Sequence, residues 1–487
     1  MTHRLVVRAD AGEWIGTGHV MRGIAIGQAW ADAGGEVVFA LAGGGAAIEA
    51  RIREEGFSLV RLDAAPGSAA DAAETVAVGA RWIAVDGYHF NADYFDALRG
   101  TARLLVVDDW GHAGRSDADL LLNGNAYASA DLYHDSMARL LIGTRYVPLR
   151  REFMRGWLPR NTPPAARTVL VTLGGADPDN RTRTIVEALS SLTLDFEARV
   201  VVGASNPHAE AVRAAAARDR RIAVLGAVSD MPALMNWADL AIAGAGTTTW
   251  ELCALGVPSL LAVLADNQAP VAQSVAERGA ALSLGRLDDV LPDRIAGRID
   301  MLMRSPELRF LLSEQGRALV DGHGAARVVR EMLAREVTLR QAGPDDQALV
   351  YAINNHPAVR RWSFSTGSIA WEDHVRWFAG KLADPRCLLY IAEDECEPVG
   401  LLRLELRGDE ATVSVGVDPG WHGRGYGTAI LRAGLAAVVG RAATLRAVIK
   451  PENAASIRAF TSAGYRPDED TTVDGERALV MRARPAA

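Results

Sequence analysis

The sequence has few of the residues that mark several protein classes. Only three of its 487 residues are cysteines, and only Lys381 and Lys450 are lysines. Cys253, Cys387 and Cys396 form no CxxC pair and are odd in number, which excludes a disulfide scaffold and predicts reduced thiols. The composition, 49% hydrophobic and 23% charged, also excludes a disordered or collagen-like chain.

Long apolar runs and clustered positive charge are missing as well. Apolar stretches such as residues 255–265 are shorter than the about 20 residues that span a bilayer. The net charge of −8 at pH 7 argues against nucleic acid as the main partner, because a phosphate backbone binds clustered cations. The first residues, MTHRLVVRAD, lead into an expected strand instead of a signal peptide. We therefore expect a cytoplasmic protein with no membrane partner, while the oligomeric state stays open.

Short aliphatic runs alternate with helical stretches, which is typical of doubly wound parallel sheets. The length of 487 residues favours three domains at about 150 residues each. A proline-rich break at residues 158–164 divides the alternating pattern into two expected α/β domains, residues 1–157 and 166–335. The expected strands are residues 4–9, 36–41, 82–86, 104–108, 168–173, 198–202, 222–225 and 240–243.

Residues 336–487 have a different pattern. Their strand-like runs follow one another largely in series, which predicts an α+β domain with an antiparallel sheet. The expected strands are residues 337–340, 388–392, 399–406 and 411–417.

A glycine loop with a histidine follows the first expected strand. Its residues Gly16, Thr17, Gly18, His19 and Arg22 open a helix in the segment IGTGHVMR. Glycines let backbone amides approach a ligand, and a helix N-terminus favours negative charge, so the loop suits a phosphate. The helix dipole disfavours an imidazolium here, which predicts that a neutral His19 acts as a general base. The alternative is a histidine that only caps the helix and glycines that only form the turn.

A nicotinamide-binding loop fits this segment less well, because the last position of GxGxxG is not glycine and residues 39–41 lack an acidic ribose ligand. Asp86 and Tyr88 follow the third expected strand, and Asp108 and Asp109 follow the fourth. Ligands of such sheets bind beyond these strand ends, so we expect Asp86 and Tyr88 to orient a sugar or a water. Solvated loop residues are the alternative.

The second expected domain contains two further glycine loops. Gly174 and Gly175, in LGGADPDN, form a phosphate-compatible turn. In the later loop GAGTTTWE, backbone amides and hydroxyls would hold a diphosphate, and one carboxylate would accept both ribose hydroxyls. The binding residues expected in this later loop are Gly246, Thr247, Thr248 and Glu251.

The phrases IGTGHVMR, LGGADPDN, GTTTWELCALGVPS and LADNQ together resemble the UDP-sugar hydrolases of pseudaminic acid biosynthesis, which are related to the glycosyltransferase of peptidoglycan synthesis. The resemblance implies two Rossmann-like domains in a GT-B arrangement with a nucleotide-sugar between them. It implies that His19 is the catalytic base, that Tyr88 belongs to the catalytic site and that Glu251 holds the uridine ribose. It also implies that Asn267 and Gln268 lie near the sugar or the phosphates.

The implied reaction is attack by water on the anomeric carbon, with departure of UDP and inversion of configuration. This reaction needs one base and several phosphate donors but no covalent nucleophile. The sequence contains neither a GxSxG elbow nor an HExxH zinc motif, and we expect no metal. A glycosyltransferase that uses a sugar acceptor in place of water is the alternative.

A glycine loop of another kind, DPGWHGRGYGT, precedes an expected helix over residues 429–439 and, with NAAS and AGY further on, resembles the GNAT acyltransferases. By that resemblance, the amides of residues 423–427 hold the pyrophosphate of acetyl-CoA, and residues 414–417 splay from the next strand to receive its pantetheine arm. The expected cofactor-binding residues are Val415, Val417, His422, Gly423, Arg424, Gly425, Tyr426, Gly427, Thr428 and Asn453.

Two positions depart from the GNAT pattern. His422 stands where Gln or Arg is usual, and Phe460 stands where many members have the tyrosine that protonates the departing thiolate. Tyr465 and Tyr426 are the candidates for the missing acid.

The segments NHPAVRRW and WEDH resemble the nucleotide-sugar N-acetyltransferase of the same pathway. Glu405 and His374 are candidate bases for the attacking amine, with a solvated strand residue and a helix-face residue as the alternatives. We therefore expect a bifunctional enzyme whose partners are acetyl-CoA and a UDP-linked amino sugar. In the alternative, the third domain is a non-catalytic CoA-binding or scaffolding module.

Overall fold

The structure is a computed structural model that describes residues 3–12, 15–113, 118–155, 158–175, 177–203, 206–226, 228–333, 337–394 and 397–485. The chain forms two compact units, Met1–Met332 (unit 1) and Leu333–Ala487 (unit 2). Cys396 and the expected domain boundaries at residues 157 and 335–336 lie outside the described residues.

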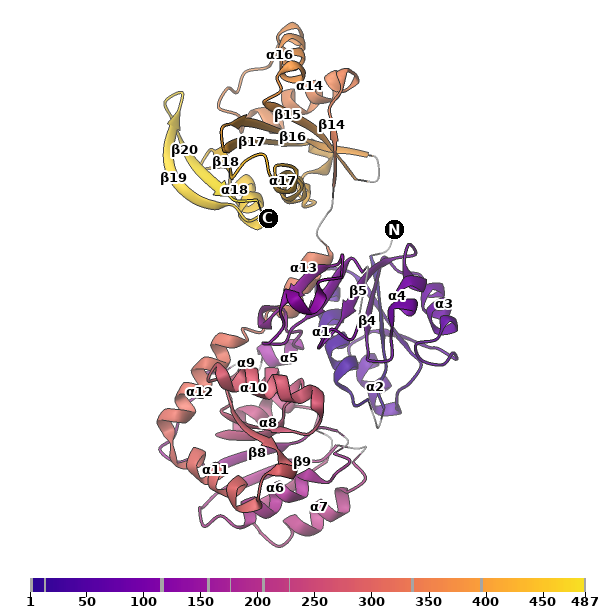
Figure 1. The fold of residues 1–487 in the computed structure, drawn as a ribbon, viewed down its shortest axis with the longest axis vertical. Helices are drawn as coiled ribbons and strands as arrows, with labels where there is room; N and C mark the ends of the chain where they lie inside the picture. The colour runs from indigo at the N-terminus through magenta and orange to yellow at the C-terminus, as the bar shows by residue number, and fades with distance from the viewer. Residues whose placement is uncertain are drawn as a thin grey trace. The chain divides into compact units, whose positions relative to one another are not determined.

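The first sheet of unit 1 is parallel and has the strand order β3-β2-β1-β4-β5-β6-β7. Its strands are β1 (Arg4–Ala9), β2 (Glu36–Leu41), β3 (Ser58–Arg61), β4 (Trp82–Asp86), β5 (Arg103–Val107), β6 (Leu120–Asn123) and β7 (Arg139–Ile142). The helices between them are α1 (Gly18–Asp32), α2 (Ala46–Glu54), α3 (Ala69–Ala77) and α4 (Ala92–Leu98). Figure 1 labels the strands β4 and β5 of this sheet and the helices α1 to α4 around them. The strand order reverses between β1 and β4, and the crevice at such a reversal is where ligands of parallel sheets bind.

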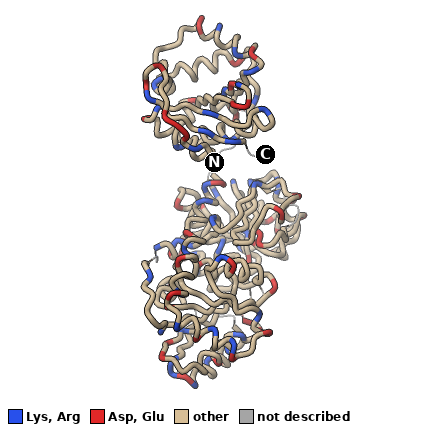
Figure 2. Tube along the Cα trace, turned by 60° about the vertical axis from the view of Figure 1, so that its left-hand side comes forward, with Lys and Arg blue, Asp and Glu red and all other residues tan. Residues whose placement is uncertain are grey.

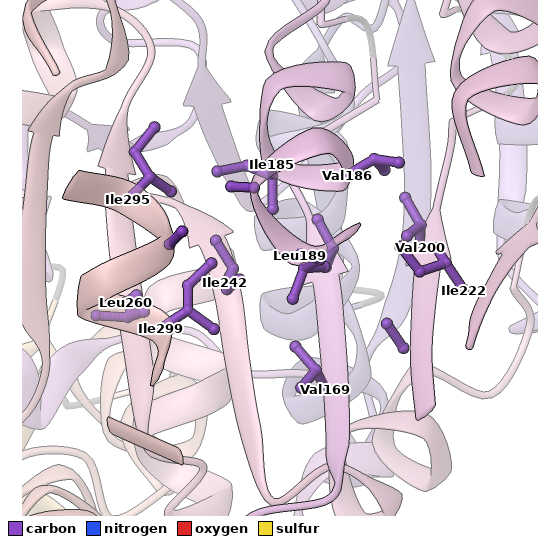
Figure 3. Close-up of a cluster of buried hydrophobic side chains, with 14 of the residues drawn as sticks. Val169, Ile185, Val186, Leu189, Val200, Ile222, Ile242, Leu260, Ile295 and Ile299 are labelled. Atoms are coloured by element: carbon purple, nitrogen blue, oxygen red, sulfur yellow. The ribbon is translucent and has the colours of Figure 1, made fainter. Parts of the chain in front are cut away.

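The second sheet of unit 1 is also parallel, with the order β10-β9-β8-β11-β12-β13. Its strands are β8 (Thr168–Thr172), β9 (Glu197–Val201), β10 (Ile222–Leu225), β11 (Leu240–Gly244), β12 (Ser259–Val263) and β13 (Leu282–Arg286). Its helices are α6 (Arg181–Ser190), α7 (Ala209–Ala216), α8 (Met231–Trp237), α9 (Thr248–Leu255), α10 (Ala269–Glu277), α11 (Pro292–Arg304) and α12 (Pro306–Leu319). Figure 3 shows Leu189 of α6 and Ile299 of α11 packed against strand residues such as Val169 and Ile242. The aliphatic runs form strands because helices cover them and remove them from water.

The last helix of unit 1, α13 (Gly324–Met332), crosses back to the first sheet. Val328, Val329 and Met332 lie in the same buried cluster as Leu5 and Val20. The expected second domain, residues 166–335, includes this helix. The helix follows the second domain in sequence, but its apolar side completes the core of the first. The short helix α5 (Arg151–Arg155) lies in the connection between the two sheets.

Unit 2 contains a mixed sheet with the order β14-β15-β16-β17-β18-β20-β19. Its strands are β14 (Thr338–Gln341), β15 (Cys387–Asp394), β16 (Glu397–Arg407), β17 (Glu410–Val417), β18 (Thr444–Ile449), β19 (Arg466–Val473) and β20 (Glu476–Ala483). The pair β17 and β18 is parallel and the other neighbours are antiparallel. The helices are α14 (Gln347–Asn355), α15 (Pro357–Arg360), α16 (Trp371–Ala383), α17 (Tyr426–Ala437) and α18 (Ala454–Ser462).

Basic and acidic residues are interspersed along both units (Figure 2). Within the part of the chain that the structure describes, every helix is too short or too polar to cross a membrane.

Candidate functional site

A cleft of about 2180 Å³ in unit 1 is lined by residues that follow strands of both parallel sheets. The loop Gly16–Gly18 comes from the first sheet, and the loop that ends at Thr247 comes from the second. These loops meet: a Cβ atom added to Gly18 would lie 3.5 Å from Cγ2 of Thr247. The glycine therefore permits close approach of the two halves at the centre of the cleft.

His19 is the second residue of α1, is nearly buried, and lines this cleft. Its Nδ1 lies 2.6 Å from Oδ1 of Asp86, the last residue of β4. A carboxylate only accepts hydrogen bonds, so Nδ1 carries a proton, and in the neutral ring Nε2 then has the lone pair. The structure thus gives His19 the tautomer of a base.

The sequence-based expectation had the Asp86 carboxylate orient a sugar or a water. It faces the imidazole instead, and it is 3% exposed, which is too little for a solvated loop residue.

Arg22 was expected to bind substrate, but its guanidinium is used inside the protein. Its Nε and Nη2 donate to Asp86 over 2.9 and 2.7 Å, and its Nη1 donates to Oδ1 of Asp109 over 2.6 Å. Burial alone would raise the pKa of Asp109, but the Arg22 charge and hydrogen bond hold it below its usual range. Arg22 therefore joins two carboxylates that follow neighbouring strands.

Tyr88 stands over His19, with ring centroids 4.5 Å apart in an edge-to-face contact. Its hydroxyl donates to Oδ2 of Asp109 over 2.8 Å and accepts from Nδ2 of Asn267 over 3.4 Å. Burial and the Asp109 carboxylate raise the pKa of Tyr88, so the hydroxyl stays protonated. Asn267 follows β12, and this contact therefore links the second half of unit 1 to the first.

The other member of the expected polar pair, Gln268, serves the backbone. Its Oε1 accepts from the amide of Leu264 over 3.0 Å, although the residue also lines the cleft.

Glu251, one turn into α9, has a partner that sequence reasoning missed. Nη2 of Arg150 donates to its Oε1 over 2.9 Å. Burial raises the pKa of Glu251, and Arg150 opposes that rise. Arg150 precedes α5, and no motif marks it, because its partner is 101 residues away.

The three glycine loops of unit 1 differ in their free amides. Within the described residues, no side chain caps the N-terminus of α1 or of α9, although the amides of Thr249 and Trp250 donate to the carbonyls of Gly246 and Thr247 over 3.0 and 3.1 Å. The amides that begin the two helices, at Gly18 and Thr248, are the ones that a ligand would meet. The turn after Gly174 is different, because Asp177 accepts from the amides of Arg181 and Thr182 over 2.7 and 2.9 Å. Gly174 and Gly175 line the cleft, but α6 is already capped.

In unit 2, the register of β17 and β18 ends at the pair Thr412 and Arg446, while the strands continue to Val417 and Ile449. This is the splay expected at residues 414–417, which include Val415. Beyond it, Gly423 and Gly425 have φ of +76° and +87°, a region that glycine adopts without strain. Gly425 is the N-cap of α17, so the loop presents backbone amides at a helix start.

Most of the side chains expected to bind cofactor contact the protein itself. His422 Nε2 donates to the carbonyl of Val417 over 2.9 Å, and Asn453 caps α18 by accepting from the amide of Ser456 over 3.1 Å. Arg424 lies over the ring of Trp421, 5.0 Å from its centroid. Thr428 Oγ1 lies 3.5 Å from the carbonyl oxygen of Ala459. A Cβ atom added to Gly427 would lie 3.6 Å from the Cβ atom of Ala459, which is an ordinary contact distance. The cradle is therefore mainly backbone.

Phe460 and the two tyrosine candidates for the acid are all buried in unit 2. Phe460 is buried, with its ring edge-to-face on Tyr465 at 4.9 Å. The Tyr465 hydroxyl has no hydrogen-bond partner among the described residues, and burial raises its pKa. Tyr426 is buried and donates to Asp394, so its hydroxyl is engaged.

His374 is a core residue, not a residue of an exposed helix face. It is 1% exposed among aromatic rings, and its Nε2 donates to the carbonyl of Gln347 over 2.9 Å. Glu405 is ion-paired with Lys381 at 2.7 Å, and that hydrogen bond lowers its pKa. Neither arrangement favours a base.

Comparison with known proteins shows relatives of both units. Residues 168–319 match the glycosyltransferase family 28 C-terminal domain, and residues 336–466 match the acetyltransferase (GNAT) domain. The spore coat polysaccharide biosynthesis protein SpsG of Bacillus subtilis (strain 168) is 30% identical over 232 residues, 47% of this chain and 68% of SpsG. The chain belongs to the SpsG family.

Outside the SpsG family, the UDP-N-acetylglucosamine–N-acetylmuramyl-(pentapeptide) pyrophosphoryl-undecaprenol N-acetylglucosamine transferase of Pseudomonas aeruginosa (strain LESB58) is 31% identical over 42% of this chain, which spans 57% of that transferase. Among solved structures, MurG of Acinetobacter baumannii is similar over 68% of this chain and 99% of its own, with 18% identity and a TM-score of 0.49. The acetyltransferase AAC(6')-Ib is similar over 31% of this chain and 94% of its own, with 20% identity and a TM-score of 0.29.

The expected fold class is confirmed by the sheets and the family matches. Two Rossmann-like parallel-sheet domains, the SpsG-related part, precede a mixed-sheet GNAT domain. The hydrolase activity and the pseudaminic acid pathway that the sequence suggested stay predictions.

Proposed function

We propose that unit 1, in a GT-B arrangement, hydrolyses a UDP-linked sugar with His19 as the general base. The observation that carries the proposal is the His19–Asp86 pair at the point where two uncapped helix N-termini enter one cleft. A helix N-terminus favours a diphosphate, and an oriented neutral imidazole favours removal of a proton beside it.

The cleft offers a place for each part of such a substrate. The diphosphate would lie between the amides near Gly18 and Thr248, which approach each other across the cleft. Glu251 would accept the two ribose hydroxyls once they displace Arg150. Tyr88 and Asn267, which contact each other across the two halves, would lie against the sugar.

In the proposed reaction, a water oxygen attacks the anomeric carbon as the bond from that carbon to the phosphate oxygen breaks. UDP leaves with the bonding electrons, and the configuration at the carbon inverts. Nε2 of His19 takes the proton from the water, and Asp86 stabilises the imidazolium that forms. The amides of both helix N-termini offset the charge that develops on the leaving group.

A second candidate is transfer of the sugar to a sugar acceptor, which the family 28 match and the related N-acetylglucosamine transferases support. The test is to incubate the full chain with UDP-sugar and no acceptor. Release of free UDP together with free sugar supports hydrolysis. UDP release that appears only after an acceptor is added contradicts hydrolysis and supports transfer.

For unit 2 we propose N-acetylation of a UDP-linked 4-amino sugar by acetyl-CoA. The GNAT match, the splay of β17 from β18 and the amide cradle at Gly423 and Gly425 support it. The amine nitrogen attacks the thioester carbon and loses a proton as the amide forms, the C–S bond breaks, and CoA leaves as a thiolate that takes a proton. Of the two tyrosine candidates, Tyr465 alone has a hydroxyl without a partner among the described residues, and we assign it the acid.

The acetylated product would then be the substrate of unit 1, which would release a 2,4-diacetamido-trideoxy sugar in pseudaminic acid biosynthesis. The alternative is a unit 2 that binds CoA without catalysis. Mass spectrometry of the full chain with acetyl-CoA and a panel of UDP-4-amino sugars distinguishes them. Binding of CoA with no acetylated product across the panel contradicts the acetyltransferase. Tyr465→Phe, which removes the hydroxyl, is expected to slow acetyl transfer about 10²-fold or more.

A further inference from the structure

Asp109 lies in the turn after β5 and binds three side chains from different segments. Its Oδ1 accepts from Nη1 of Arg22 over 2.6 Å and from Nδ2 of Asn125 over 3.0 Å. Its Oδ2 accepts from the hydroxyl of Tyr88 over 2.8 Å. The side chain is 13% exposed and therefore has little access to water.

The backbone of Asp109 is held as firmly as its carboxylate. Its carbonyl accepts from Nδ2 of Asn123 over 2.7 Å and from the hydroxyl of Tyr127 over 2.8 Å. Five donors thus fix one residue, and the carboxylate cannot turn away without leaving a buried donor unpaired, which is costly.

Arg22 carries the effect of Asp109 to the histidine. Nη1 of Arg22 is on Asp109, while Nε and Nη2 are on the two oxygens of Asp86, whose Oδ1 also accepts from His19. If Asp109 lost its charge, the guanidinium would be free to shift, and Asp86 would shift with it. The hydrogen bond that sets the tautomer of His19 therefore depends on a residue that does not touch it.

The charges of this cluster also suit proton transfer. Two carboxylates and one guanidinium leave one net negative charge beside a neutral His19. When the imidazole takes a proton, the cluster becomes neutral, which is the less costly state in a buried site. The charged and titratable groups near His19 are Asp86 and Arg22 in contact, Tyr88 over the ring, and Asp109 and His112 beyond it.

We propose that Asp109 is a positioning residue of unit 1 that holds Arg22 and Tyr88 in place and, through Arg22, fixes Asp86 against His19. The proposal rests on the proposed role of His19 as the base. It does not depend on whether water or a sugar hydroxyl is the acceptor.

The test compares Asp109→Asn with Asp119→Asn in the full chain. Asp119 precedes β6 and therefore lies at the other end of the parallel strands from Asp109. It accepts from Nε of Arg103 over 3.1 Å, so the control also removes a carboxylate that pairs with arginine. For Asp109→Asn we expect kcat to fall about 10- to 100-fold, a range typical of residues that orient a catalytic group. The Kd of UDP stays within about threefold, and the acidic limb of the kcat–pH profile moves to lower pH, since the imidazolium loses a stabilising charge. Asp119→Asn is expected to change none of these.

A second readout needs no turnover. The Nδ1 proton of His19, bonded to Asp86, is expected to give a downfield NMR signal that is absent in His19→Asn. That signal should be lost or displaced in Asp109→Asn and unchanged in Asp119→Asn. If the wild type releases no UDP, the proposed function fails, but this signal still tests the positioning role.

The proposal is overturned if Asp109→Asn keeps kcat within about twofold, with the acidic limb and NMR signal unchanged. A loss confined to UDP binding also overturns it, because Asp109 would then serve the nucleotide and not His19. If Asp109→Asn does not fold, Tyr127→Phe, which removes one hydrogen bond to the Asp109 carbonyl, is expected to lower kcat a few-fold without raising KM. An unchanged kcat in that variant contradicts the proposal.

Discussion

The candidate site of unit 1 is built mainly from side chains, whereas the candidate site of unit 2 is built mainly from backbone amides. In unit 1 the important groups are side chains from distant segments: 67 residues separate His19 from Asp86, and 101 separate Arg150 from Glu251. In unit 2 the cofactor cradle is one continuous loop between β17 and α17, and it offers backbone amides at Gly423 and Gly425. The first site should therefore be sensitive to the chemistry of single side chains, and the second to the conformation of its backbone.

The largest effect is expected for His19→Asn in unit 1. Loss of a positioned general base lowers kcat for UDP release about 10²- to 10⁴-fold. The control is His134→Asn, which changes a solvent-exposed histidine of the same unit. The measurement is UDP release under saturating UDP-sugar, and a loss of only a few-fold would remove His19 from the role of base.

The matching change in unit 2 alters the backbone. Gly425 has φ of +87°, so Gly425→Val strains the loop and weakens CoA binding about 10- to 100-fold, as a strain of about 1–3 kcal/mol implies. Gly440→Val is the control, since Gly440 has φ of +74° in the segment after α17. Calorimetric titration with CoA checks both variants. Equal losses of CoA affinity in the two would show that general strain, not the cradle, is responsible.

A smaller effect, on UDP affinity, is expected at Glu251, whose carboxylate is proposed to accept hydrogen bonds from the ribose. Glu251→Gln removes the charge from that hydrogen bond and raises the Kd of UDP about tenfold at pH 7. The control Glu187→Gln changes a carboxylate of α6 that is ion-paired with Arg183 on the helix surface. Titration calorimetry with UDP measures the difference, and an unchanged Kd in Glu251→Gln argues against a ribose contact.

The smallest effect concerns a carboxylate of unit 2 that serves stability alone. Nη1 and Nη2 of Arg340 each donate to Asp346 over 2.9 Å, and these hydrogen bonds lower the pKa of Asp346, although burial opposes them. Such a group adds stability above the unfolded-state pKa and loses it as the pH falls through the folded-state pKa.

Asp346→Asn is therefore expected to destabilise unit 2 by about 1 kcal/mol at pH 7, a value reduced by the exposure of Arg340. The difference from the wild type should disappear as the pH falls below about 4. Urea unfolding at several pH values measures it. A constant difference across that range would mean that packing, not charge, is lost.

The sequence predicted much of the fold because the relevant signals are local. The bounds expected for β1, β2 and β4 agree with the structure, since each is a short aliphatic run with turn residues at its ends. The sequence did not indicate that α13 packs on the first sheet, because no local signal states which of two cores an amphipathic helix will cover.

The site shows the same division. Sequence motifs located His19 and Glu251, and they marked Asp109 only as an acidic residue at a strand end. They could not find Arg150, and they gave Arg22 to the substrate when its hydrogen bonds go to Asp86 and Asp109.

By itself, the sequence determined the alternation of strands and helices and the positions of the glycine turns. It also placed His19 after the first strand and the carboxylates Asp86 and Asp109 at the ends of two later strands. Each of these features depends on residues a few positions apart, because the spacing of apolar residues sets strand or helix and the conformational freedom of glycine sets the turns. The tertiary structure alone decided that Asp86 binds His19, that Asp109 binds Arg22 and Tyr88, and that Arg150 binds Glu251. These contacts join strand ends and loops far apart in the chain, so their chemistry exists only after the sheets and the cleft have formed.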